Sequence, residues 1–105
     1  MAMAKTSGKA RRKTKTRAYD TAKYLRNEKD MVAYLEAALE EGDAALVAAA
    51  VGDIARARGM TRVAQDTGLG RESLYKALSA TGNPELGTVL KVLSSMGIRL
   101  HASAA

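Results

Sequence analysis

Apolar residues recur at intervals of three and four along most of this chain, which is the spacing of one face of an α-helix. Between Asn27 and Gly42 the apolar positions are Met31, Tyr34, Leu35, Ala38 and Leu39. Between Asp43 and Gly59 they are Leu46, Val47, Ala50, Val51 and Ile54. Gly42 suits the left-handed residue that ends many helices, and Asp43 is a good N-cap. The pattern therefore predicts one helix from about Asn27 to Gly42 and a second from Asp43 to just before Gly59.

Two shorter helices with a tight turn between them follow. Thr61 is a residue type that caps helices, and residues 62–67 form the first short segment. The second segment, residues 71–79, is separated from it by Gly68, Leu69 and Gly70. This order of elements predicts two helices joined by a glycine turn.

The C-terminal part of the chain carries a last helix. Asn83 is expected to cap this helix and Pro84 to take its first position. The helix is expected to end near Met96, before Gly97. Its apolar face consists of Leu86, Val89, Leu90 and Leu93. After it, residues 98–101 alternate apolar and polar, which is typical of a short strand. We therefore predict an all-α fold, a compact bundle of about five helices, with a short strand at the C-terminus.

The amino-acid composition limits the kinds of core, binding site and activity that we expect. The chain has 105 residues and neither Phe nor Trp, so we expect a single core of Ala, Leu, Val, Ile and Met. It has no cysteine and one histidine, His101, so we expect neither a metal nor another cofactor. That histidine has no nucleophile or carboxylate constellation around it, so we expect no enzyme activity. No apolar run reaches the ~18 residues that cross a bilayer, and we expect a cytoplasmic protein without membrane contact.

The net charge of +6 is unevenly distributed. Residues 1–17 carry seven cationic residues and no acid, with almost no apolar residue among them. We predict a disordered basic tail over residues 1–18 and one helix-turn-helix domain over residues 19–105. Within that domain residues 20–53 hold eight acids against three bases, whereas residues 56–91 hold six bases against three acids. The second half therefore suits a polyanion such as nucleic acid.

Residues 61–79 carry the features that a helix-turn-helix requires. Ala64 is small where the two helices cross, and Gly68 tolerates the positive φ of the turn. The apolar residues that anchor both helices to the core are Val63, Leu69, Leu74 and Ala77. Leu74 and Leu78 repeat at i and i+4, so one side of the second helix turns inward and the other is left for a ligand. The same arrangement occurs in helical bundles that bind no DNA, and this alternative stays open.

The outward side of this motif carries residue types that suit a DNA groove. Arg71 can bind guanine or a phosphate, Glu72 can accept from cytosine N4, and Ser73 can bond to several bases. Tyr75 and Lys76 suit backbone phosphates or a thymine methyl group, and the start of the first helix normally meets the phosphate backbone. The candidate DNA-contacting residues are Thr61, Arg62, Gln65, Gly70, Arg71, Glu72, Ser73, Tyr75 and Lys76.

Two stretches of the chain resemble a known family. Residues 61–100 resemble the helix-turn-helix of lambda repressor and Cro relatives, and specifically the HigA-like antitoxins of the probable addiction module antidote family, in the run TRVAQDTGLGRESLYKALSATGNPELGTVLKVLSSMGIRL. The N-terminal region of that family resembles residues 19–43, YDTAKYLRNEKDMVAYLEAALEEGD. The resemblance implies an N-terminal helical segment over residues 19–42 and a repressor-like core over residues 43–105. Gly70 departs from the Ser that often caps the second helix in this family.

The resemblance implies an antitoxin of a type II toxin-antitoxin module. Such proteins neutralise a small basic toxin of the RelE/ParE superfamily by direct binding and repress their own promoter by binding double-stranded operator DNA as homodimers. The alternative is a stand-alone helix-turn-helix repressor without a toxin partner. Dimers are usual because one short recognition helix covers few base pairs, and half-sites lie about 34–36 Å apart. Two dimer contacts stay open: pairing of residues 98–100 with their symmetry mate, and packing of the last helix against its copy.

The acidic segment from Tyr19 to Glu41 is the surface that we expect to meet the toxin, since opposite charge speeds the encounter with a basic partner. The candidate toxin-contacting residues are Tyr19, Tyr24, Tyr34, Glu36 and Glu40. A solvated acidic helix face without a partner is the alternative. His101 is expected to be an ordinary surface residue.

Overall fold

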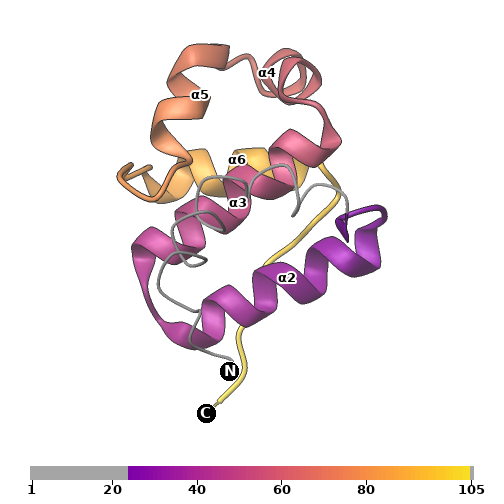
Figure 1. The fold of residues 1–105 in the computed structure, drawn as a ribbon, viewed down its shortest axis with the longest axis vertical. Helices are drawn as coiled ribbons and strands as arrows, with labels where there is room; N and C mark the ends of the chain where they lie inside the picture. Colours follow the sequence, from indigo (N-terminus) through magenta and orange to yellow (C-terminus); the bar gives the residue numbers. More distant parts are fainter. Residues whose placement is uncertain (1–23, 105) are drawn as a thin grey trace, which may run out of the picture.

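The computed structural model describes residues 24–104, which form five helices and no strand (Figure 1). The helices are α2 (Glu28–Glu41), α3 (Ala44–Arg58), α4 (Met60–Thr67), α5 (Arg71–Ala77) and α6 (Leu86–Ser95). The all-α prediction is therefore confirmed for this part of the chain. The predicted basic tail, residues 1–18, and the start of the predicted domain, residues 19–23, lie outside the described residues. No helix within residues 24–104 is long and apolar enough to span a membrane.

The ends of α2 and the start of α3 follow from local side-chain chemistry. The side chain of Asn27 accepts a hydrogen bond from the Asp30 N–H at 2.9 Å, and that of Asp43 accepts one from the Ala45 N–H at 2.9 Å. Gly42, between the two helices, has a left-handed φ of 71°. The predicted start near Asn27, the end at Gly42 and the cap at Asp43 are confirmed, because each depends on neighbours within three residues.

The predicted cap of α4 is wrong. This helix begins at Met60 with Gly59 as its N-cap, so Thr61 lies inside the first turn and caps nothing. Met60 is only 4% exposed, and a helix that starts there places it on the same buried side as Val63, three residues later. Burial of Met60 therefore decides the start of the helix, against the capping preference of Thr61.

The last helix begins later than predicted. α6 starts at Leu86 with Glu85 as its N-cap, and Asn83 and Pro84 belong to the preceding loop. Gly82 in that loop lies so close to the end of α5 that a Cβ there would overlap the last carbonyl oxygens of that helix. This close approach holds the start of the loop against the end of α5.

The core is organised around α3, which packs against each of α2, α4, α5 and α6. The largest fully buried side chains of the core are Val51, Ile54, Val63, Leu74, Leu78, Val92, Leu93 and Met96. In Figure 1, α4 and α5 lie at one end of the molecule, on the opposite side of α3 from α2. The predicted DNA-reading helices are therefore well separated from the acidic α2.

The buried face of α6 differs from the predicted stripe. Leu93 is buried and Val89 is half-buried, as predicted, but Leu86 is 69% exposed and Leu90 is 44% exposed. Val92 takes an inward position instead. Helical periodicity tells which residues share a side of the helix, but it does not tell how much of an apolar side the neighbouring helices cover.

The predicted C-terminal strand is wrong, although its alternation is present. Ile98 is buried, Leu100 is half-buried, and Arg99 and His101 are exposed. The segment runs from the end of α6 past α2 (Figure 1). A strand needs a neighbouring strand to exchange hydrogen bonds with, and none occurs within the described residues.

Candidate nucleic-acid interface

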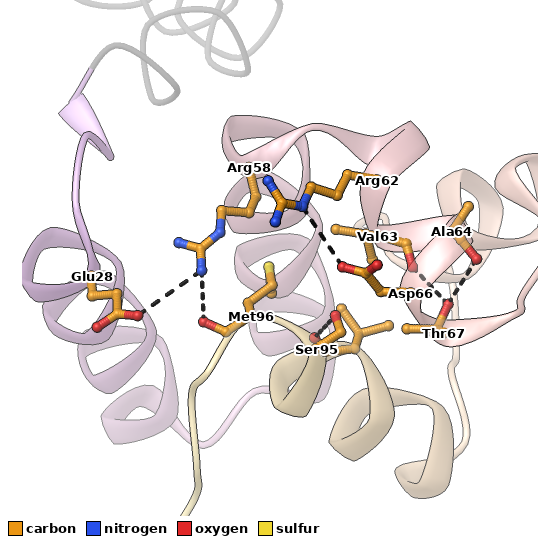
Figure 2. Close-up of polar contacts among 10 residues, drawn as sticks. Glu28, Arg58, Arg62, Val63, Ala64, Asp66, Thr67, Ser95 and Met96 are labelled. Atoms are coloured by element: carbon orange, nitrogen blue, oxygen red, sulfur yellow. Dashed lines mark hydrogen bonds and ion pairs between the residues drawn. The ribbon is translucent and has the colours of Figure 1, made fainter.

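A glycine and a threonine build the turn between α4 and α5. Gly68 has a φ of 75°, and its N–H donates to the carbonyl oxygen of Ala64 at 2.9 Å. Thr67 Oγ1 donates to the carbonyl oxygen of Val63 at 2.8 Å (Figure 2), and it accepts from the N–H of Leu69 at 3.2 Å. The sequence predicts the left-handed glycine but does not single out Thr67, although Thr near a helix end commonly bonds back to a carbonyl four residues earlier. Together the two residues fix the direction in which the chain leaves α4.

α5 is anchored to the core from one side. Leu74 is 1% exposed and Leu78 is 0% exposed, as their spacing predicts. The backbone at Leu78 packs directly on Gly52 of α3. The sequence pattern predicts the close approach of helices at Ala64, which is half-buried against the core, and does not single out Gly52. The only signal for Gly52 is a glycine in the middle of an otherwise apolar helix.

The opposite side of α5 is open to solvent. All nine candidate DNA-contacting residues are exposed: Thr61, Arg62, Gln65, Gly70, Arg71, Glu72, Ser73, Tyr75 and Lys76. Three of them belong to α4, and the other six belong to the turn and to α5. The structure thus brings the predicted residues onto two adjacent helices and covers none of them with another described part of the chain.

The charged side chains of this surface are held only by weak contacts. The guanidinium carbon of Arg71 lies 5.8 Å from the ring centroid of Tyr75, one turn further along α5. The Nε of Arg62 lies 3.8 Å from Asp66 Oδ2, and both side chains are exposed, 77% and 47% (Figure 2). Lys76 makes no ion pair within residues 24–104. An exposed ion pair contributes little stability, so Arg62 can exchange its contact with Asp66 for a phosphate at low cost.

Two arginines of the basic segment, residues 56–91, make contacts that stabilise the fold instead. Arg58 Nη2 donates to the carbonyl oxygen of Met96 at 3.0 Å and lies 3.9 Å from Glu28 Oε2, so it links α3 to α6 and α2 (Figure 2). Arg56 Nη2 donates to Oδ1 of the buried Asp53 at 2.9 Å. The charge count of the sequence includes both arginines, but within residues 56–91 the exposed cations are Arg62, Arg71 and Lys76 on α4 and α5, and Lys91 on α6.

The candidate toxin-contacting residues differ in exposure, and three of them, Tyr34, Glu36 and Glu40, belong to α2. Tyr24 is 71% exposed, and Glu36 and Glu40 are exposed. Tyr34 lies on the inward side, where its hydroxyl donates to a buried carboxylate of α3 at 2.6 Å. Tyr19 lies outside the described residues. The outer side of α2, and not Tyr34, is therefore the part that a partner can reach.

Several apolar side chains are exposed, contrary to the pattern of the sequence. Leu39, Leu86 and Leu90 belong to predicted inward stripes, yet they are 43%, 69% and 44% exposed. Val32 on α2 is 45% exposed. No group of three or more metal-binding side chains occurs in the part of the chain that the structure describes. The open surface is thus polar on α4 and α5, and partly apolar on α2 and α6.

Comparisons with known proteins confirm the family of probable addiction module antidote proteins that the sequence resembles. The model of a family described as "Probable addiction module antidote protein" matches residues 15–104. A protein of Haemophilus influenzae described as "Uncharacterized protein" is 46% identical over 83 residues, which cover 79% of this chain and 86% of that protein. No solved structure shows a significant match. Since the family model matches all the described residues, the chain belongs to the family of probable addiction module antidote proteins.

Proposed function

We propose that this chain is the antitoxin of a type II toxin-antitoxin module, which neutralises a small basic toxin of the RelE/ParE superfamily by direct binding and represses its own promoter. In this proposal it is a cytoplasmic binding protein, not an enzyme, and it reads double-stranded operator DNA as a homodimer without a cofactor. Membership of an antidote family supports the antitoxin role, because an antidote implies a toxin partner.

The observation that carries the DNA-binding role is the division of α5 into two sides. Leu74 and Leu78 hold one side of α5 in the core, while Arg71, Ser73 and Lys76 of the same helix are exposed. A short helix held in this way can enter the major groove, which is about 12 Å wide, while the preceding helix crosses the phosphate backbone. This arrangement supports helix-turn-helix reading of an operator.

The side chains divide into base readers and phosphate contacts. Arg71 and Glu72 lie in the first turn of α5, the part of a recognition helix that meets base edges. Arg71 suits guanine and Glu72 suits the amino group of cytosine. Lys76, in the last turn, suits a phosphate. The carboxylate of Glu72 also repels phosphate, which favours a base-reading position over a backbone position for this residue.

Binding of the full chain to a fragment of its own promoter tests the DNA-binding role. Arg71→Ala should weaken binding by about 1–3 kcal/mol and relax sequence preference, whereas Lys76→Ala should weaken binding to all sequences and lower the salt slope by about one. Lys29→Ala on α2 removes the same charge far from α5 and is the matched control. Equal affinity for all three variants, or no binding by the wild type, would contradict the proposal.

Coexpression with the product of the adjacent gene tests the antitoxin role. A small basic protein should copurify with the chain, and Glu40→Lys should slow their association because it reverses a charge on the outer side of α2. Glu85→Lys makes the same charge change at the start of α6 and should leave association unchanged. If no neighbouring product binds while the promoter is still bound, the stand-alone repressor replaces the antitoxin.

A further inference from the structure

Two hollows flank the extended C-terminal segment, residues 98–101. One has a volume of about 540 Å³ and lies between the segment and α6, where Leu90 and Leu93 line it. The other has a volume of about 230 Å³ and lies between the segment and α2, where Val32 and Leu39 line it. Because Ile98, Arg99 and Leu100 line both hollows, the segment separates them. We name the two hollows together with this segment the C-terminal groove. It consists of Val32, Glu36, Leu39, Leu90 and residues 98–101.

In the described part of the chain, the C-terminal groove exposes apolar side chains and includes backbone groups without a backbone partner. Val32, Leu39 and Leu90 are each exposed by more than two fifths, at 45%, 43% and 44%. The Ile98 N–H donates to Leu93 at 2.9 Å, but beyond it the backbone of residues 99–104 makes no hydrogen bond with another described backbone group. An extended segment whose backbone has no backbone partner among the described residues, and which lies between apolar hollows, is the kind of surface to which another chain adds a strand.

The charged residues of the groove favour a partner whose surface carries both positive and negative charges. Glu36 from α2 and Arg99 from the segment line the same hollow, with His101 beside them. Glu36 and Arg99 make no ion pair within the described part of the chain. A basic toxin would meet Arg99 there, and a polyanion would meet Glu36. A second copy of this chain, related by a two-fold axis, presents the opposite charge to both residues at once.

We propose that the C-terminal groove is the contact between two copies of this chain. A two-fold axis through the groove places Glu36 of each copy near Arg99 of the other and covers the apolar side chains at its rim. This inference rests on the proposed function in one respect, since it supplies the dimer that operator reading requires. α4 and α5 lie across α3 from α2 (Figure 1), so a copy seated over α2 and the C-terminal segment leaves their outward side chains uncovered. Glu36 then belongs to the dimer contact, and Tyr24 and Glu40 remain for the toxin.

Sedimentation equilibrium of the full chain tests this contact. Leu90→Lys and Val32→Lys each place a charge at the rim of the groove and should raise the dimer dissociation constant about tenfold or more. Leu86→Lys is the matched control, because Leu86 lies on the same helix as Leu90, is 69% exposed and lines neither hollow. All three sites are at least two fifths exposed, so the variants should fold, and unfolding curves check this. A dimer that Leu86→Lys disrupts and Leu90→Lys does not would overturn the proposal.

A charge exchange gives an independent test. Glu36→Arg and Arg99→Glu should each weaken the dimer, because each brings like charges together across the axis, and the double variant should restore it. Failure of the double variant to recover would mean that these two residues do not meet. A wild-type chain that is monomeric at all concentrations, or whose toxin affinity rather than self-association responds to Leu90→Lys, would overturn the proposal as well.

Different outcomes would refute the dimer contact and the DNA-binding role. If the groove is the dimer contact, Leu90→Lys should still bind a single half-site through α5, with affinity equal to that of the wild type for that half-site. It should lose the gain in affinity that the wild type shows on two half-sites. A wild type that dimerises through the groove but binds no promoter DNA would refute the proposed function and leave the contact in place.

Discussion

The backbone of Leu78, at the C-terminal end of α5, rests on Gly52 in the middle of α3. A Cβ at position 52 would lie 3.1 Å from the carbonyl carbon and from the Cβ of Leu78, and closer still to the Leu78 carbonyl oxygen. Both residues are buried. The depth at which α5 sits on the core, and hence the projection of its outward side chains, is therefore determined by the absence of a side chain on another helix.

We expect Gly52→Ala to push α5 outward and to lower the free energy of unfolding by about 1–3 kcal/mol, the usual cost of adding atoms to a well-packed core. This loss should appear even though Ala is a better helix former than Gly. Urea unfolding measures the stability. Affinity for promoter DNA should fall in the same variant, because the reading helix has moved.

Gly87→Ala is the matched control for this substitution. Gly87 also lies in a helix, and no heavy atom outside its immediate surroundings lies within 4 Å of the added Cβ. Its stability should rise by up to about 1 kcal/mol, with no change in DNA affinity. If both variants lost the same stability, the contact with Leu78 would not be the cause.

The stacking of Arg71 on Tyr75 yields a second prediction. The ring restricts the positions that the guanidinium can take, so less conformational entropy is lost when Arg71 binds DNA. Tyr75→Phe keeps the ring and should keep promoter affinity, whereas Tyr75→Leu removes it and should lose about 0.5–1 kcal/mol, the value of an exposed cation–π contact. Fluorescence anisotropy measures both. A loss with Tyr75→Phe equal to that with Tyr75→Leu would assign the effect to the hydroxyl group instead.

Features of the fold that depend on near neighbours in the sequence could be predicted. The left-handed glycines Gly42 and Gly68 and the cap at Asp43 are fixed by hydrogen bonds over at most four residues, so the sequence alone locates them. The start of α4 depends instead on burial of Met60, and the path of the loop before α6 depends on packing of Gly82 against α5. Those contacts join separate elements, and no local pattern contains them.

The candidate site divides in the same way. The i, i+4 spacing of Leu74 and Leu78 predicts the buried side of α5, and the exposed residues follow by elimination. The internal use of Arg56 and Arg58 could not be predicted, because a charge count does not distinguish an arginine that binds a buried aspartate or a helix carbonyl from one at the surface. The exposure of Leu90 escaped prediction as well, since it depends on where the neighbouring helices end.

A third prediction concerns the polar link between α2 and α3. The hydroxyl of Tyr34 donates to Oδ2 of the buried Asp53 at 2.6 Å. Tyr34→Phe should lower the free energy of unfolding by about 1.5–3 kcal/mol, the range for hydrogen bonds to charged groups. Tyr24→Phe removes the same hydroxyl from a residue that is 71% exposed, and its effect should stay within about 0.5 kcal/mol. Equal unfolding curves for the two variants would show that the link adds no stability.

The cap of α3 gives a fourth prediction, which separates stability from DNA reading. Asp43→Ala removes the oxygen that accepts from the Ala45 N–H and should cost about 1 kcal/mol, or about 4–8 °C in Tm for a domain of this size. Asp43→Ser keeps a capping oxygen and should stay within a few tenths of a kcal/mol of the wild type.

Glu41→Ala, which removes an exposed acid without a cap bond, controls for the charge change. Thermal unfolding followed by circular dichroism measures all three, and promoter affinity at low temperature should be the same for each, because α3 stays folded there and its contact with α5 is unchanged. A serine variant as unstable as the alanine variant would show that the carboxylate acts through its charge and not as a hydrogen-bond acceptor.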